Sequence, residues 1–237
     1  MNRLDTEQQR LYPDAVDGQA RALVLGLARP ADWTLLRSVW QGVQADLELP
    51  APAIAVSGTD SYQLWFSLAQ PVALEQALGF LEQLRQRYLA EVAPSRIAMW
   101  PVADAPSPGS VRVAPPVPAL QEATGNWSAF VSPDLPAVFG EDPWLDMAPG
   151  LDAQADLLSR IKSIQPDEWT HALQRLSPAE ATADRPSPAK PPRPSSGLPM
   201  EPRQFLQAVM NDATAPLALR IEAAKALLPF TGQRRGG

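Results

Sequence analysis

The side chains of this 237-residue chain that could ligate a metal ion are almost all carboxylates, because the chain has 26 acidic residues, one histidine and no cysteine. The chain has no cysteine, which excludes thiolate metal sites, and its only histidine, His171, has no acid or nucleophile at a useful spacing. The cluster Glu141, Asp142 and Asp146 is rich enough in oxygen to suggest a cation site, but no histidine or regular ligand loop accompanies it. We therefore expect a solvated acidic loop, and we predict no catalytic residue, metal site or cofactor.

Two tryptophans offer a different chemistry, because bases of single-stranded nucleic acid stack on aromatic rings. Trp65 is the stacking candidate, Trp100 is the second ring, and Gln63 is the polar group that would contact a base. The alternative is that residues 125–147, which contain four aromatic side chains, cover both rings. The sequence leaves these two interpretations open.

Alternation and helical spacing predict the elements that position these rings. Large and small residues alternate in four segments, which predicts strands over residues 21–28, 53–57, 62–69 and 96–100. Apolar residues at three- and four-residue spacing predict helices over residues 31–47 and 71–89. The order is βαββαβ, which is typical of a ferredoxin-like or RRM-like α+β core with both helices on one sheet face.

The alternation also divides the predicted sheet into two faces. We expect the large aliphatic set to face the helices: Leu23, Leu25, Leu27, Ile54, Val56, Leu64, Phe66, Leu68, Ile97 and Met99. The opposite face would hold small residues together with Gln63, Trp65 and Trp100. The candidate binding residues are therefore expected on the face that the helices leave open.

Proline divides the chain into regions. Six prolines fall in residues 1–100 and eighteen in residues 101–200, so the regular core is expected at 1–101 and a proline-rich extension with short helices at 102–176. Residues 177–199 have too little apolar surface to offset the entropy of ordering and are predicted to be a disordered linker. Residues 200–230 are predicted to form a helical hairpin and residues 231–237 a disordered tail.

The segment AIAVSGTDSYQLWFSLAQPV at 53–72, with the preceding strand and helix, resembles the core of the archaeo-eukaryotic primase and primase-polymerase superfamily. The resemblance covers roughly residues 20–101 and rests on Ser57, Gly58 and Trp65. Where that family carries two metal-binding aspartates this chain has Gly26 and Ala28, and Gln63 replaces the family's histidine. Glycine and alanine cannot ligate the divalent ions of phosphoryl transfer, so the resemblance implies a noncatalytic relative.

The predicted C-terminal hairpin is similar to a short segment of small-subunit terminase-like proteins of tailed phages, over about 30 residues. A hairpin of this length buries too little area to be very stable alone, so we expect its apolar stripe to dock on a partner, on another copy or back on the body of the chain. The residues expected on that docking surface are Phe205, Val209, Leu217, Ile221 and Leu228.

Charge and hydropathy limit the classes of function. The net charge is −6, with −9 in residues 1–176, which argues against a general nucleic-acid coat protein. No apolar run is long enough to span a bilayer and the N-terminus is polar, so we expect a cytoplasmic protein with no membrane partner.

Three functions follow from these observations. The first is a noncatalytic primase-like binding or scaffold module of phage or mobile-element origin, acting in DNA replication or packaging. It would hold a protein partner or, weakly, single-stranded nucleic acid. The second is a packaging adaptor that works through the C-terminal hairpin. The third is an active nucleotidyltransferase with rearranged metal ligands, which Gly26, Ala28 and Gln63 oppose.

Overall fold

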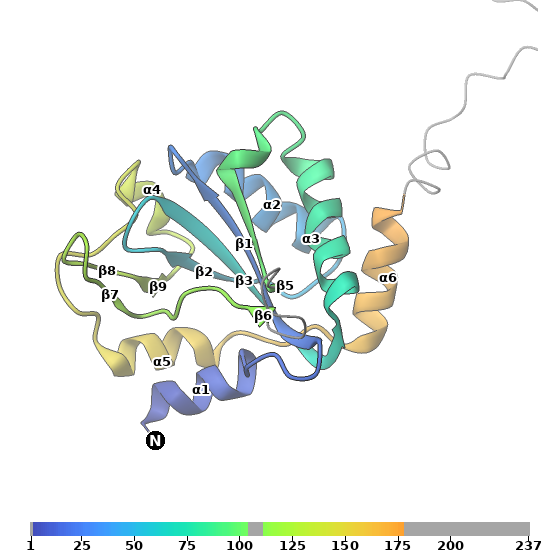
Figure 1. Ribbon diagram of the computed structural model, residues 1–237, viewed down its shortest axis with the longest axis horizontal. Coiled ribbons are helices and arrows are strands. Elements are labelled where there is room, and N and C mark those ends of the chain that lie inside the picture. The colour runs from blue at the N-terminus through green and yellow to red at the C-terminus, as the bar shows by residue number, and fades with distance from the viewer. Residues whose placement is uncertain (1, 104–110, 178–237) are drawn as a thin grey trace, which may run out of the picture. The chain divides into compact units, whose positions relative to one another are not determined.

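A five-stranded antiparallel sheet with helices against it forms the centre of the described chain (Figure 1). The computed structural model describes residues 2–103 and 111–177. Its helices are α1 (Arg3–Leu11), α2 (Trp33–Ala45), α3 (Leu74–Tyr88), the 3₁₀ turn η1 (Pro94–Arg96), α4 (Pro136–Phe139), α5 (Leu151–Ser159) and α6 (Pro166–Leu176). The predicted α+β class with an antiparallel sheet is therefore confirmed.

The strands of the main sheet lie in the order β4-β1-β3-β2-β9. Their bounds are β1 (Gln19–Ala28), β2 (Ala53–Val56), β3 (Ser61–Ala73), β4 (Ile97–Trp100) and β9 (Ala129–Val131). Two further pairs of short strands lie outside it: β5 (Val102–Ala103) with β6 (Val111–Arg112), and β7 (Leu120–Gln121) with β8 (Asn126–Trp127).

The two long helices begin where a side-chain cap or the end of a strand pairing places their first residue. Asp32 caps α2, because its side chain accepts a hydrogen bond from the backbone N–H of Leu35 at 3.1 Å. The prediction that the second helix begins at Pro71 is wrong. Strand β3 continues to Ala73 because Val72 still pairs with Ala20 of β1, and α3 begins at Leu74.

The helices α2 and α3 cover what we call the helical face of the sheet, and the predicted aliphatic set does pack on this side (Figure 1). Leu25, Leu64 and Phe66 are at most 1% exposed there. Between the two helices, Tyr88 lies directly over Gly42, where an added Cβ would come within 2.3 Å of the tyrosine ring. The packing between α2 and α3 therefore leaves no room for even one added methyl group at Gly42.

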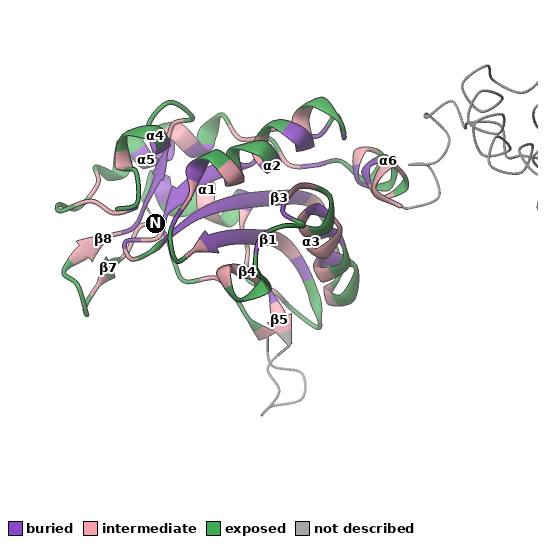
Figure 2. Ribbon diagram, turned by 90° about the horizontal axis from the view of Figure 1, so that it is seen from above, coloured by how far each residue is buried: buried purple, intermediate pink, exposed green. Residues whose placement is uncertain are grey.

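The opposite face is also covered, by α1, which the sequence analysis did not predict, and by Phe130 and α5 of the predicted proline-rich extension. Leu4 and Leu11 of α1 and Leu158 of α5 pack there with Val24 and Trp65. Helices α1 and α5 lie side by side along this part of the molecule (Figure 1), and the strands between the layers are largely buried (Figure 2). We call this side the pocket face, because it holds the pocket described below. The prediction of helices on one side of the sheet implied an open face here, and this face is instead covered by α1 and α5.

A side chain closes the outer edge of β9. The backbone N–H of Phe130 donates to Gln154 Oε1 at 2.7 Å, and Gln154 Nε2 donates to the carbonyl oxygen of Phe130 at 2.9 Å. Gln154 lies on α5 and is 4% exposed. Its amide thus occupies the place that the backbone of a further strand would take.

Several predicted regions lie outside the described residues. These are residues 178–199 of the predicted linker, the predicted hairpin and tail, and the docking residues Phe205, Val209, Leu217, Ile221 and Leu228.

Candidate functional site

The floor of the candidate site comes from the alternation of β1. Its small residues Ala20, Ala22 and Val24 border the pocket. Val24 lies opposite Trp65 of β3 on one side and opposite Trp100 of β4 on the other. The sheet register therefore places a row of two tryptophans with a valine between them across three neighbouring strands.

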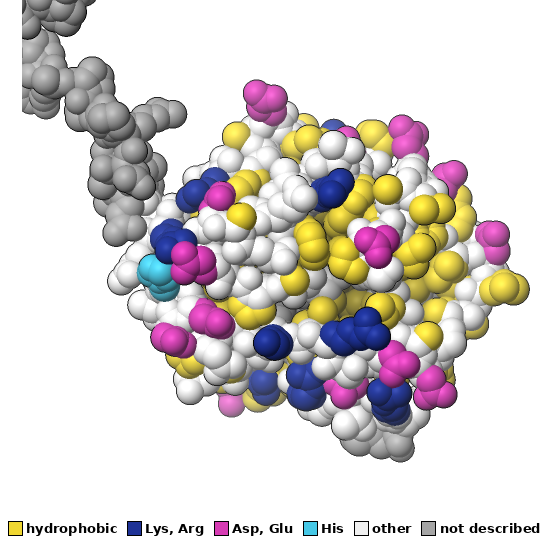
Figure 3. All heavy atoms as spheres, turned by 180° about the vertical axis from the view of Figure 1, so that it is seen from behind, with side chains coloured by type: hydrophobic (Ala, Val, Ile, Leu, Met, Phe, Trp, Pro, Cys, Tyr) yellow, Lys and Arg dark blue, Asp and Glu magenta, His cyan; other side chains and the backbone are white. Residues whose placement is uncertain are grey.

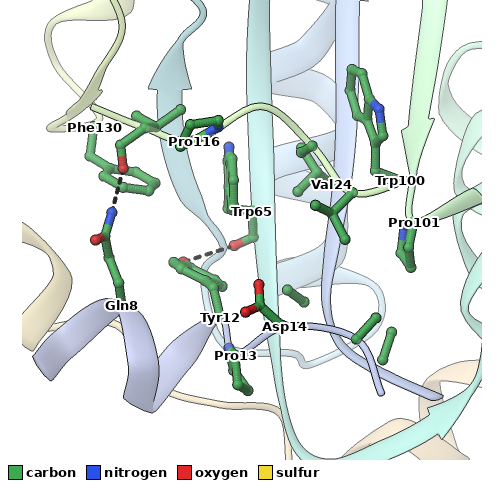
Figure 4. A pocket seen from close by; sticks show the side chains of 16 residues that line it. Gln8, Tyr12, Pro13, Asp14, Val24, Trp65, Trp100, Pro101, Pro116 and Phe130 are labelled. Atoms are coloured by element: carbon green, nitrogen blue, oxygen red, sulfur yellow. Dashed lines mark hydrogen bonds between the residues drawn. The ribbon is translucent and has the colours of Figure 1, made fainter. Parts of the chain in front are cut away.

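The walls come from the loop after α1 and from the chain before β9. The Tyr12 ring meets Trp65 edge-on, with 5.2 Å between ring centroids, and stacks on Phe130 at 6.0 Å. Its hydroxyl donates to the carbonyl oxygen of Trp65 at 3.4 Å, and burial raises the pKa of this phenol, so it stays neutral. Gln8 Nε2 donates to the carbonyl oxygen of Val117, which joins α1 to the segment across the pocket (Figure 4).

These walls enclose a pocket of about 370 Å³ (Figure 4). That volume is in the range of sites for small ligands or a few peptide side chains, about 300–1,000 Å³. The residues that line it are Gln8, Tyr12, Pro13, Asp14, Ala15, Ala20, Ala22, Val24, Trp65, Trp100, Pro101, Val113, Ala114, Pro116, Val117 and Phe130. Asp14 is the one charged residue among them, and Figure 4 shows its carboxylate directed into the space between Tyr12 and Val24.

The predicted base-binding residues are placed differently from one another. Gln63 is 3% exposed and Trp65 is 7% exposed, and Trp65 Nε1 donates to Gln63 Oε1 at 2.9 Å. These two side chains thus contact each other, and Tyr12 and Phe130 pack against the Trp65 ring. Trp100 is half-buried, lines the pocket and lies over Gly26, whose missing Cβ would be 3.2 Å from the ring.

Ser57 and Gly58 lie in the β2–β3 turn and do not line the pocket. Ser57 Oγ accepts hydrogen bonds from the backbone N–H groups of Thr59 and Ser61, at 3.1 and 3.0 Å. Gly58 has a φ of +78°, and a Cβ there would approach the backbone nitrogen of Ser128 to 2.7 Å. In this structure the serine organises the turn, and the glycine lets residues 127–128 pack against it.

The groups considered for metal chemistry do not come together. Within residues 2–103 and 111–177, no group of three or more histidine, cysteine or acidic side chains is arranged to hold a metal ion. Glu141, Asp142 and Asp146 are exposed, and so is His171.

Sequence reasoning missed Tyr12 and Asp14. The N-terminal segment is mostly polar, and no element was assigned to it. A signal was nevertheless available, because Leu4, Leu11 and Tyr12 are spaced by seven and eight residues, as on one face of a helix.

The described residues form a second pocket and an exposed hydrophobic surface as well. A second pocket of about 280 Å³ lies between the end of β3 and α6, where it is lined by Val72 and Trp169 among others. Hydrophobic side chains also gather on the face seen in Figure 3, and Val138 and Met147 are the most exposed large hydrophobic residues described, at 80% and 78%. The residues that line the second pocket include no charged side chain, unlike those of the first.

No family model matches the chain, and no curated protein matches it. Across the described parts of the chain, no helix has both the length and the apolar character needed to cross a bilayer.

Proposed function

We propose that this chain is a noncatalytic, primase-like binding module and that the pocket between Tyr12, Trp65 and Trp100 is its binding site. The observation that carries the proposal is the pocket itself, which is lined by aromatic and apolar side chains and by one charged residue, the exposed Asp14. Such a concave, mostly apolar site with few polar groups is the usual form of a ligand site.

The connectivity supports a ferredoxin-like core. Elements β1, α2, β2, β3, α3 and β4 follow one another in a βαββαβ order. Their strands take the antiparallel order β4-β1-β3-β2, and β9 extends the sheet beyond β2. The fold hosts many functions, so the function has to be argued from the site.

The residues at the resembled catalytic positions support a binding role. Gly26 and Ala28 offer no side-chain oxygen to a divalent ion, and the Trp100 ring lies over Gly26. Gln63 is buried and hydrogen-bonded to Trp65, so it is not free to contact a nucleotide in this conformation. Phosphoryl transfer needs charged groups around the metal ions, and none of these three residues supplies one.

A protein partner suits the pocket better than nucleic acid does. The net charge of −9 over residues 1–176 repels phosphates, and the only charge that lines the pocket is negative. The resemblance to primases and terminase-like proteins favours a partner from DNA replication or packaging.

The pocket can be tested with N-phenyl-1-naphthylamine, an uncharged apolar dye whose fluorescence rises when it leaves water. We expect the dye to bind the full chain and to fail to bind Ala22→Leu, because the added side chain fills the pocket without removing any group. Gly79→Leu is the matched control, since a side chain added there meets nothing within 4 Å. Equal dye binding by all three proteins would refute the proposed site.

The noncatalytic part of the proposal has its own test. Primer-extension assays of the full chain with magnesium or manganese should give no template-dependent product. A product that disappears in Asp60→Ala would overturn this part of the proposal, because Asp60 is the carboxylate of the β2–β3 turn.

A further inference from the structure

Building on the proposed function, we propose that the pocket takes a proline-rich segment of a protein partner, with a basic side chain of that segment beside Asp14. Three independent properties of the pocket lead to this occupant: its rings, its hydrogen-bonding groups and its charge. Each of them is a property of residues that line it.

The rings suit an extended proline-rich chain. Tyr12, Trp65 and Trp100 all line the pocket, as do Pro13 and Pro116 on either side. Grooves lined by aromatic residues bind polyproline II segments, because the flat ring surfaces contact the proline rings and the segment is already extended before it binds. Little conformational entropy is then lost on binding.

The hydrogen-bonding groups suit a ligand that accepts more than it donates. The indole N–H of Trp65 already donates to Gln63, and the Tyr12 hydroxyl donates to the Trp65 carbonyl oxygen. The indole N–H of the half-buried Trp100 makes no hydrogen bond to the described residues and is reached by solvent. A proline-rich backbone has carbonyl oxygens to accept such a donor and few N–H groups, so it leaves few donors unsatisfied in an apolar pocket.

The charge selects a basic segment. Asp14 is the one charged residue that lines the pocket, and its carboxylate is directed into it (Figure 4). Lysine or arginine in the ligand would neutralise this group, whereas an acidic peptide or a nucleic-acid backbone would bring like charges together. The net charge of −9 over residues 1–176 favours the same kind of ligand.

The experiment measures fluorescence anisotropy of labelled ten-residue peptides with the full chain. The probe is PPPKPPRPPP, and two control peptides separate its features: PPPEPPEPPP reverses the charge, and AAAKAARAAA removes the prolines. We expect saturable binding of the probe, binding of the acidic peptide at least about fivefold weaker, and no measurable binding of the alanine peptide.

Variants with matched controls assign the contacts. Asp14→Asn should weaken binding about threefold, as expected for a partly solvated ion pair, whereas Asp17→Asn, which changes an exposed acid outside the pocket, should not. Trp100→Phe keeps a ring but loses the N–H, and should weaken binding about fivefold. Trp144→Phe, a half-buried tryptophan that does not line the pocket, should leave binding unchanged.

The outcomes separate this inference from the proposed function. If the apolar dye binds in the Ala22-dependent way but the proline peptide does not, the pocket is a site and the proline-rich occupant is wrong. A labelled single-stranded oligonucleotide that binds more tightly than the peptide would also overturn the inference. The same holds if the peptide binds only after Pro191, Pro192 and Pro194 have been changed to alanine, because the chain's own proline-rich segment would then be the occupant.

Discussion

The two faces of the sheet come from the same strands yet differ in how they are filled. On the helical face, leucine, isoleucine and phenylalanine meet α2 and α3, and the packing leaves no room for a methyl group at Gly42. On the pocket face, alanines surround two tryptophans, and short elements from distant parts of the sequence cover them incompletely. Alternating residue size along one strand can therefore close one face of a sheet and leave a pocket on the other.

The largest expected effect contrasts two neighbouring residues of β3 that point to opposite faces. Phe66→Ala should lower the free energy of unfolding by about 3–5 kcal/mol, because it opens a cavity in a closed core. Trp65→Ala should cost about 2–3 kcal/mol, since the space it leaves joins a pocket that is already present. Denaturant unfolding of both variants measures the difference. Equal losses would contradict the contrast between a closed face and an incompletely filled one.

The next effect concerns the edge of the pocket face. Gln154→Ala removes both hydrogen bonds to Phe130 and leaves a buried N–H and a buried carbonyl group unpaired. The free energy of unfolding should fall by about 2–3 kcal/mol. Gln174→Ala on the exposed side of α6 is the control and should change it little. Hydrogen exchange at the amide of Phe130 should accelerate in the first variant alone, and unchanged protection would refute the role of Gln154.

A third comparison enlarges one side chain on each face of the sheet, with Gly42→Ala on the helical face and Ala22→Leu on the pocket face. Gly42→Ala forces the Tyr88 ring to move away from Asp46, to which its hydroxyl donates at 2.9 Å. Even after the gain in helix propensity, this should cost about 1 kcal/mol. Ala22→Leu on the pocket face adds more atoms and should cost less, because the pocket has room for them. Thermal unfolding of the two variants tests the order, and a larger loss for Ala22→Leu would reverse our assignment of the two faces.

The smallest effect is expected from one hydroxyl on each face. The Tyr62 hydroxyl lies 2.8 and 2.7 Å from the carbonyl oxygens of Pro136 and Gly140 and shares its one hydrogen between them, so Tyr62→Phe should cost about 1 kcal/mol at neutral pH. Tyr12→Phe should cost less, because the hydroxyl of Tyr12 makes one long bond of 3.4 Å.

The pKa of Tyr62 predicts that the stability of the fold depends on pH. Burial, with Asp142 and Asp32 nearby, raises the pKa of Tyr62 to about 12 from the ordinary value of 10.0. The unfolded tyrosine therefore loses its proton first, and the contribution to stability is present below pH 10 and lost as the pH rises towards 12. Tyr62→Phe should make the fall in stability over that interval less steep. An unchanged slope would show that Tyr62 keeps its ordinary pKa.

The strong patterns in the sequence predicted the core, and the weak ones did not. Leu23, Leu25 and Leu27 alternate with small residues, so their strand and its helix-facing side could be predicted. The segments that make the pocket carry little local signal. Strand β9 is three residues long and forms because β2 offers it an edge, and α1 holds only two buried leucines. Long-range contacts decide such elements, and no window of the sequence contains both partners.

The candidate site was predicted only in part for the same reason. Trp65 and Trp100 were found from the alternation of their strands, and both line the pocket. Tyr12 and Asp14 come from a loop whose position depends on α1 packing beside α5, a contact between residues about 150 positions apart. Ser57 and Gly58 were chosen from a motif, whereas their contacts in the structure organise a turn.

The amide of Gln154 also limits how copies of this protein can polymerise through their sheets. A fibril grown by strand addition needs two free edges on every subunit, one for the previous copy and one for the next. Within the described residues, β4 has no strand on its outer side, whereas Gln154 occupies the outer side of β9. Two copies joined through β4 would therefore present to a third copy only β9 edges of the main sheet, and Gln154 already occupies those edges.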